Sequence, residues 1–175
     1  RCSSCRSCAD SHREYCRSMR FRAVGRGALA RAGRENRDEE GQRDAFRAGA
    51  LSVACLLNHK FEVERYRQSR AWDPIVGVSF TGLFDFFVHA FGSSWLEWWA
   101  AGRPATEAGE SFKRQEAEYL SRWKSIVNEA VWSYCDKHGL RRPNRCTTVQ
   151  PAGTKSLLTG AAPGWHPPKA QRFIR

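Results

Sequence analysis

Two segments of the chain change from a strand-like to a helix-like pattern across a glycine-containing turn. In the first, Ile75 to Phe80 is a nearly continuous apolar run rich in branched side chains, and Leu83 to Phe91 is an apolar helix that Gly92 ends. Such a run is typical of a strand that is buried on both faces. A strand, a glycine turn and a helix form half of a β/α unit, so the pattern predicts a protein of the α/β class.

The second segment is "CTTVQPAGTKSLLTG", residues 146–160, and it has the same order. Cys146 to Gln150 is predicted to be a strand that ends at Pro151, because proline cannot donate to a β-ladder. Gly153 lets the main chain approach a ligand, and the next three residues expose amides, hydroxyls and one ammonium at a helix start. Unpaired amides and the helix dipole attract anions there, so the turn is a candidate phosphate site.

The same turn has two other interpretations. A Walker A loop requires glycine directly before lysine, but Thr154 separates Gly153 from Lys155, and the earlier glycine of that motif is replaced by Thr148. That motif is therefore excluded. The remaining alternative is that Thr154 only caps a helix.

Further helices are predicted from apolar residues at three- and four-residue steps. Residues 38–60 begin with three acids, which suit the positive end of a helix, and they have one apolar face. A longer helix keeps the same spacing from Phe112 to Tyr134 and stops at Gly139. The solvated side of this longer helix is assigned to its charged residues: Lys113, Arg114, Glu116, Arg122, Lys124 and Glu129.

Three tryptophans, Trp95, Trp98 and Trp99, occur within five residues and fall on one helical face. Such a cluster can stack nucleic-acid bases. It is more typical of a protein core, because large aromatic side chains dominate packing there. We therefore expect these three side chains to be buried.

Residues 1–37 differ in composition from the rest of the chain. They hold ten arginines against three acids, and too few large apolar side chains to offset the entropy of ordering them. The expectation is a basic disordered arm, and an arm of this charge suggests a nucleic-acid-binding protein as one alternative function. The other alternative is a small zinc-binding adaptor, whose ligands would be Cys2, Cys5 and Cys8 with Cys16 or His12.

The whole chain has 175 residues and a formal charge of +11, of which the first 37 residues carry most. No run approaches the 18 apolar residues that a transmembrane helix needs, so no membrane partner is expected. The cysteines beyond the first stretch, Cys55, Cys135 and Cys146, are too scattered for a disulfide framework. This favours a reducing cytoplasm, and we expect no specific nucleic-acid partner.

Two stretches of the chain, in this order, resemble a known enzyme family. They are "DEEGQRDAFRAGALSVACLLNHKF…ERYRQSRAWDPIVGVSFTGLFDFF" and "TVQPAGTKSLLTGA" followed by "PGWHPPKAQRFIR". The family is that of adenosylcobalamin-dependent (class II) ribonucleotide reductases, of the ribonucleoside-triphosphate reductase type. The resemblance implies that residues 38–175 are a fragment of the catalytic barrel domain, a helix-rich partial arc of a ten-stranded α/β barrel. Such an arc cannot close, so it is not expected to be stable or active alone.

The resemblance also implies an activity and its partners. The family converts ribonucleotides to 2′-deoxyribonucleotides by thiyl-radical chemistry, with adenosylcobalamin as cofactor, a deoxynucleotide effector and a thioredoxin-type reductant. Triphosphates are the expected substrates. The family's turn for the substrate phosphates matches Pro151, Ala152, Gly153, Thr154 and Lys155. Related enzymes carry a serine where this chain has Ala152, so that hydroxyl contact is missing.

The chain departs from the family at its radical and redox positions. The Asn-Pro-Cys-x-Glu loop and the "CNL" motif are absent, and Cys55, Cys135 and Cys146 match no redox cysteine, so none receives a catalytic role. The abrupt change in composition suggests that residues 1 to about 36 are a reading-frame error or a junction in the gene model. Translation of the parent nucleotide sequence in the other frames should then yield one of the missing motifs; their absence from every frame contradicts the hypothesis.

Overall fold

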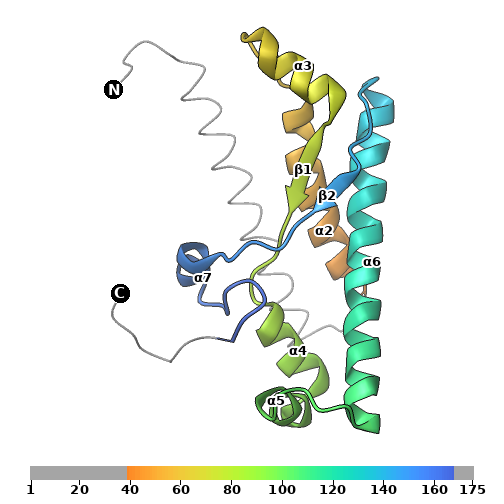
Figure 1. Cartoon of the computed structure of the whole chain (residues 1–175). Helices are drawn as coiled ribbons and strands as arrows, with labels where there is room; N and C mark the ends of the chain where they lie inside the picture. The colour runs from red at the N-terminus through yellow and green to blue at the C-terminus, as the bar shows by residue number, and fades with distance from the viewer. Residues whose placement is uncertain (1–38, 168–175) are drawn as a thin grey trace.

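The computed structural model describes residues 39–167, which form seven helical segments and two short strands. Helix α6 runs along most of the molecule, the strands lie beside its C-terminal half, and α3 and α5 lie toward opposite ends (Figure 1). The elements in chain order are α2 (Glu39–Ala54), the 3-10 turn η1 (Cys55–Asn58), α3 (Glu64–Trp72), β1 (Ile75–Val78), α4 (Leu83–Phe91), α5 (Ser93–Ala100), α6 (Glu107–Lys137), β2 (Arg145–Thr147) and α7 (Gly153–Thr159).

Several sequence-based interpretations fall outside these residues. They concern the arginine-rich segment, with the ligand set Cys2, Cys5, Cys8, His12 and Cys16, and the end of the "PGWHPPKAQRFIR" motif. Among the described helices, none combines the length and the apolar character that crossing a membrane requires.

Strands β1 and β2 pair in parallel, with Ile75 opposite Arg145 and Val78 opposite Thr147. Helices α2 and α6 pack against each other and against this sheet. The fold is therefore mostly helical with α/β character, as the strand and helix patterns predicted; the described residues show no barrel. Both strands are shorter than expected, and Ile75 is exposed, so the prediction of a strand buried on both faces is wrong at that residue.

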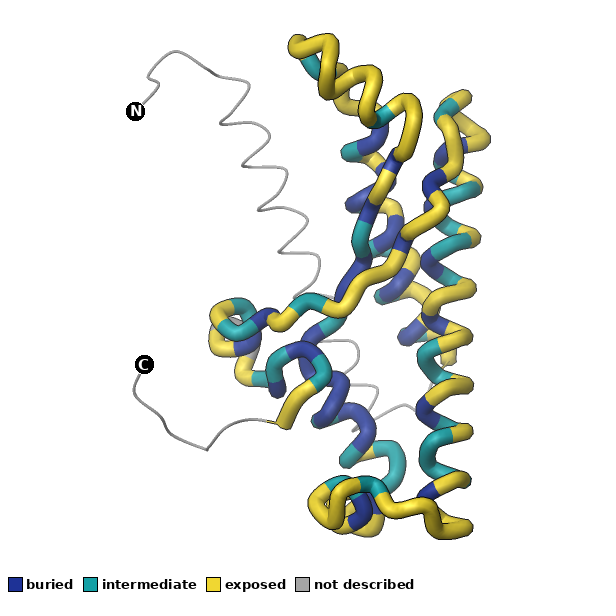
Figure 2. Tube along the Cα trace, in the orientation of Figure 1, coloured by how far each residue is buried: buried dark blue, intermediate teal, exposed yellow. Residues whose placement is uncertain are grey.

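An aromatic core joins α4, α5 and α6. Trp95 is 1% exposed, and its ring centroid lies 5.0 Å from that of Phe84 and 5.6 Å from that of Phe87. Trp98 is also buried, which confirms the expectation for these two residues, whereas Trp99 is only half-buried and packs against the edge of the core. Burial follows the hydropathy of each element: Figure 2 shows α4 largely buried and α3 almost wholly exposed.

Glu116 lies in this core and not on the solvated face of α6, so its sequence-based assignment is wrong. The residue is 4% exposed. Its carboxylate accepts a hydrogen bond of 2.7 Å from Trp95 Nε1 and an ion-paired hydrogen bond of 2.6 Å from Arg103. The Arg103 guanidinium also lies over the rings of Trp98 and Trp99. A buried carboxylate is tolerated here because both of its oxygens have donors.

Helix α3 was not expected, because residues 64–72 have no apolar stripe and none of them is buried. Local polar pairs support it instead: Glu64 accepts hydrogen bonds from Arg67 and from Gln68, one turn further along the helix. Exposed pairs of this kind stabilise a helix only slightly. The helix is further tied to η1 by Arg70, which donates to the Leu56 carbonyl.

Substitutions at two glycines, Gly49 and Gly77, test how closely α2 and the segment after β2 pack against β1. An alanine Cβ at Gly49 in α2 would lie 3.6 Å from Val78, an ordinary contact, whereas one at Gly77 in β1 would lie 2.9 Å from the Thr148 methyl group. Gly49→Ala is expected to raise the free energy of unfolding by about 0.5–1 kcal/mol. Gly77→Ala should lower it by about 1–3 kcal/mol. Urea unfolding followed by circular dichroism measures both; the opposite order would contradict this packing.

Candidate functional site

The candidate phosphate turn, residues 151–155, lies directly beyond the carboxyl ends of the parallel strands. Past β2, the Thr148 amide donates to the Val78 carbonyl at 3.0 Å, and the Gln150 amide donates to Ser79 Oγ at 3.0 Å. These bonds hold the segment after β2 against the segment after β1. In open α/β sheets, ligands bind at the carboxyl ends of the strands, so the turn occupies a position suited to binding.

The backbone reverses at Ala152, which has a left-handed conformation with φ of 54° and ψ of 26°. Its methyl group is buried, and its carbonyl accepts the first hydrogen bond of α7, from the Ser156 amide at 2.9 Å. The residue that precedes the helix is therefore Ala152, and Thr154 lies within the helix, so the alternative that Thr154 caps it is wrong. Left-handed backbone is costly for a residue with a side chain, so the surrounding contacts must hold this turn.

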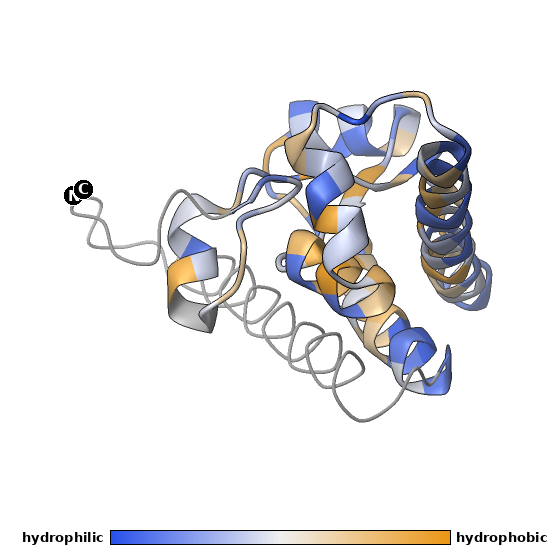
Figure 3. Ribbon diagram, turned by 90° about the horizontal axis from the view of Figure 1, so that it is seen from below, coloured by the Kyte–Doolittle hydropathy of each residue, from blue (hydrophilic) through white to orange (hydrophobic). Residues whose placement is uncertain are grey.

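The start of α7 presents main-chain donors. Within residues 39–167, no acceptor is found for the amides of Gly153 and Thr154. Gly153 is half-buried and Thr154 is exposed, so both amides lie near the surface. Helix α7 lies at the side of the molecule away from α6 (Figures 1 and 3).

Side chains around the turn add charge and rigidity. Lys155 Nζ donates to Gln150 Oε1 at 2.6 Å, which fixes the ammonium beside the turn. Ser156 Oγ donates to the Gly153 carbonyl at 2.9 Å. An ammonium held at this position contributes positive charge beside the turn.

The segment that follows α7 closes back onto the same place. The Gly82 amide donates to the Ala162 carbonyl at 2.8 Å, and the Ala162 amide donates to Asp85 Oδ2 at 2.7 Å. Gly164 has a φ of 45°, and a Cβ there would lie 2.6 Å from the Gln150 carbonyl oxygen. These contacts hold the turn between the segment after β1 and the segment after α7.

An apolar groove of about 320 Å³ begins beside the turn. Thr148 and Val149, which directly precede Gln150, form one wall, and Phe80, Trp123 and Trp165 supply aromatic surface. The site thus combines main-chain donors, a cation and an adjoining apolar surface, which is the usual composition of a small-molecule site.

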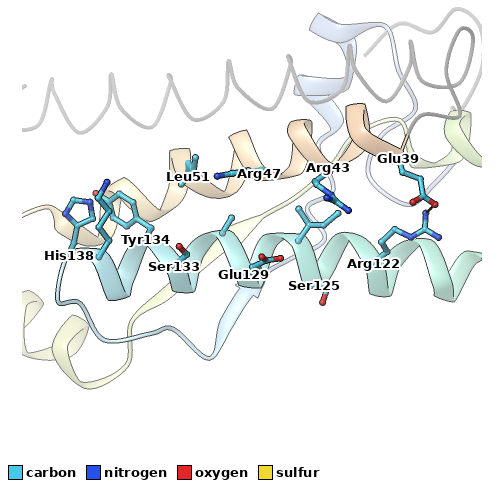
Figure 4. Close-up of a pocket in the computed structure, with 13 residues that line it drawn as sticks. Glu39, Arg43, Arg47, Leu51, Arg122, Ser125, Glu129, Ser133, Tyr134 and His138 are labelled. Carbon is cyan, nitrogen blue, oxygen red and sulfur yellow. Dashed lines mark hydrogen bonds and ion pairs between the residues drawn. The ribbon is translucent and has the colours of Figure 1, made fainter.

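A second groove, of about 580 Å³, lies between α2 and α6 (Figure 4). Arg43 and Arg47 line it from α2, while Arg122 and Glu129 line it from α6. Glu39 forms an ion pair with Arg122 at one end. Charges of both signs along this groove favour no single class of ligand, so it is a weaker candidate than the turn.

The free cysteines of the described part are not arranged for catalysis. Cys135 and Cys146 are buried, and burial raises the pKa of both thiols above the ordinary value. A thiol with a raised pKa stays protonated at neutral pH and is a poor nucleophile. Cys55 is exposed, but no partner thiol lies in the described part to form a disulfide with it.

The structure places Pro151 and Ala152 before α7, and Gly153, Thr154 and Lys155 in its first turn. Sequence reasoning missed the residues that hold this segment in place. Ser79, Gln150 and Gly164 position the turn, but they contact each other across long stretches of sequence. For these three residues the sequence offers no more than serine and glycine near the ends of predicted elements. Such residues are too common there to identify a site.

Comparison with known proteins gave one distant match. No protein-family model matches the chain, and no solved structure does. The chain is 27% identical over 128 residues to the adenosylcobalamin-dependent ribonucleoside-triphosphate reductase of Levilactobacillus brevis. The alignment covers 70% of this chain and 17% of that protein, so the chain spans less than a fifth of this relative's length.

Proposed function

We propose that residues 38–175 are part of the barrel domain of an adenosylcobalamin-dependent ribonucleotide reductase, and that residues 151–155 bind the phosphates of its ribonucleotide substrate. The observation that carries the proposal is the pair of amides at Gly153 and Thr154, which have no acceptor in the described part and lie beyond two parallel strands. The distant match to a ribonucleoside-triphosphate reductase supports the choice of family and of a triphosphate substrate.

In this proposal the turn acts through its main chain. The amides of Gly153 and Thr154 donate to phosphate oxygens, and the Thr154 hydroxyl, which is exposed, adds a third donor. The Lys155 ammonium, held by Gln150, supplies positive charge. Because Ala152 has no hydroxyl, the site binds with one side-chain donor fewer than its serine-bearing relatives.

The family's cofactor is adenosylcobalamin. The apolar groove beside the turn, about 320 Å³, is at the small end of ligand pockets and is too small to enclose a corrinoid. We therefore assign no cofactor contact to this segment. Its contribution to ribonucleotide reduction is substrate positioning; the cofactor, the deoxynucleotide effector and the thioredoxin-type reductant would be bound by other parts of the enzyme.

The test is a single substitution that places a negative charge at the first residue of α7. Gly153→Asp is expected to weaken binding of a ribonucleoside triphosphate to the full-length protein by at least about tenfold, because the carboxylate repels the phosphates. The same carboxylate suits a helix N-terminus, so the fold should be kept. Isothermal titration calorimetry gives the affinity, and thermal unfolding followed by circular dichroism checks the fold.

Gly153→Ala is the matched control. It adds a Cβ without charge, so nucleotide affinity should stay within about twofold of the unmodified chain if the amides alone do the binding. Equal affinity for Gly153→Asp and Gly153→Ala would remove the turn from the site. Loss of binding in both variants would show that space at residue 153 matters and that charge does not.

A further inference from the structure

A basic bowl of about 460 Å³ lies between α3 and the segment that follows α6. It adjoins Pro74, which leads into β1, so it lies at the amino end of that strand, opposite the candidate phosphate turn. Within the described residues, no carboxylate side chain lines it. Its ionisable lining residues are all basic: His59, Lys60, Arg67, Arg70 and Arg141.

Arg70 is the most enclosed of these cations. Its guanidinium lies 4.4 Å from the centre of the Phe61 ring, and it donates to the Leu56 carbonyl. Burial lowers the pKa of Arg70, because the charged form loses contact with water. No carboxylate in the described part forms an ion pair with it, in contrast to Arg103, which pairs with Glu116. The charge of Arg70 is therefore oriented but not neutralised.

Whereas Arg70 lines the bowl from α3, Arg141 lines it from the segment that follows α6. Its guanidinium donates to the Ala71 carbonyl at 3.3 Å, so it too is held by a neutral acceptor. Lys60 adds a third cation without a carboxylate partner in the described part. Of the cations that line the bowl, Arg67 is the one with an ion pair among residues 39–167; its partner is Glu64 on the exposed surface of α3, and such a pair is weak.

We propose that this basic bowl binds a compact phosphate-bearing anion, such as a di- or triphosphate. Guanidinium groups recognise phosphate oxygens in pairs, and two of them fixed by carbonyls would need little reordering to do so. A multiply charged ligand would neutralise Lys60, Arg70 and Arg141 together. The bowl is concave and of small-molecule size, whereas a nucleic-acid strand is typically followed by a longer basic groove.

The test is calorimetric titration of the 175-residue chain with inorganic tripolyphosphate. Every protein carries Gly153→Asp, so that the candidate phosphate turn does not contribute and the two sites are judged separately. Adding Lys60→Gln and Arg141→Gln, both exposed, should weaken binding by about tenfold or more. The matched control adds Arg43→Gln and Arg47→Gln in the groove between α2 and α6, which removes the same charge and should change affinity less than about twofold.

Three results would overturn the proposal. The first is no binding of tripolyphosphate at millimolar concentration. The second is an equal loss of tripolyphosphate affinity in both double variants. The third is binding of a single-stranded oligonucleotide through Lys60 and Arg141 without binding of tripolyphosphate. Titration with a nucleoside triphosphate then distinguishes two kinds of phosphate ligand. Tighter binding than tripolyphosphate indicates that the ligand is a nucleotide, and weaker binding indicates that it is an inorganic polyphosphate. Circular dichroism must show equal unfolding temperatures for the variants compared.

Discussion

Replacing Trp123 with alanine is expected to lower the free energy of unfolding by about 3–5 kcal/mol. The side chain is 2% exposed and stacks on Phe46, with ring centroids 5.0 Å apart. It also contacts Phe80 and Phe86, so its loss opens a cavity where α2, α4 and α6 meet. Urea unfolding followed by far-ultraviolet circular dichroism measures the change without depending on tryptophan fluorescence.

Two controls separate the causes of this loss. Trp72→Ala removes a tryptophan that is 78% exposed and should cost less than about 0.5 kcal/mol. Trp123→Phe keeps an aromatic ring but removes the Nε1 donor that Gln42 Oε1 accepts at 2.8 Å, leaving a buried amide oxygen unsatisfied at a cost of about 1–3 kcal/mol. If Trp123→Ala and Trp72→Ala had equal effects, Trp123 would not be a core residue.

Glu116→Ala is expected to cost about 3 kcal/mol, near the lower end for breaking a buried ion pair. The change leaves Trp95 Nε1 without its acceptor and Arg103 without its counter-ion. The Arg103 side chain is 28% exposed, so water recovers part of the lost interaction. Chemical unfolding of Glu116→Ala, Arg103→Ala and the double variant gives the coupling between the two residues.

Glu110→Ala is the matched control, because Glu110 lies in the same helix and pairs with Lys113 at 2.7 Å on the surface. Exposed pairs contribute about 0–1 kcal/mol. A cost for Glu116→Ala no greater than that for Glu110→Ala would contradict the buried pair.

The elements with strong periodicity could be predicted from the sequence. Helix α6 has apolar residues at regular steps, and α4 ends at Gly92 as its sequence indicates. Helix α3 could not be predicted, because its stability comes from surface pairs and from its contact with η1. Glu116 was misplaced for a related reason: its partners, Trp95 and Arg103, lie elsewhere in the chain, and a helical pattern does not reveal them.

The site was predictable only in part. The order of strand, proline, glycine and hydroxyl residues located the turn at residues 151–155, but not the left-handed Ala152 on which its shape depends. Ser79 and Gly164 hold the turn in place through their contacts with Gln150. Ser79 reaches it because β1 and β2, which are about 70 residues apart in sequence, pair with each other. The basic bowl at the other end of the sheet had no sequence signature, because its cations come from three separate segments.

Helix α6 sets a fixed distance between two parts of the molecule. Its 31 residues span about 46 Å at 1.5 Å per residue. Near one end Glu116 holds α5 through Trp95, and near the other Trp132 Nε1 donates to the Pro143 carbonyl, just before β2. One residue inserted between them would rotate one half of the helix by about 100° relative to the other. The number of residues between these two contacts is therefore constrained, and not only their identity. Insertions in this part of α6 should destabilise the fold far more than most substitutions.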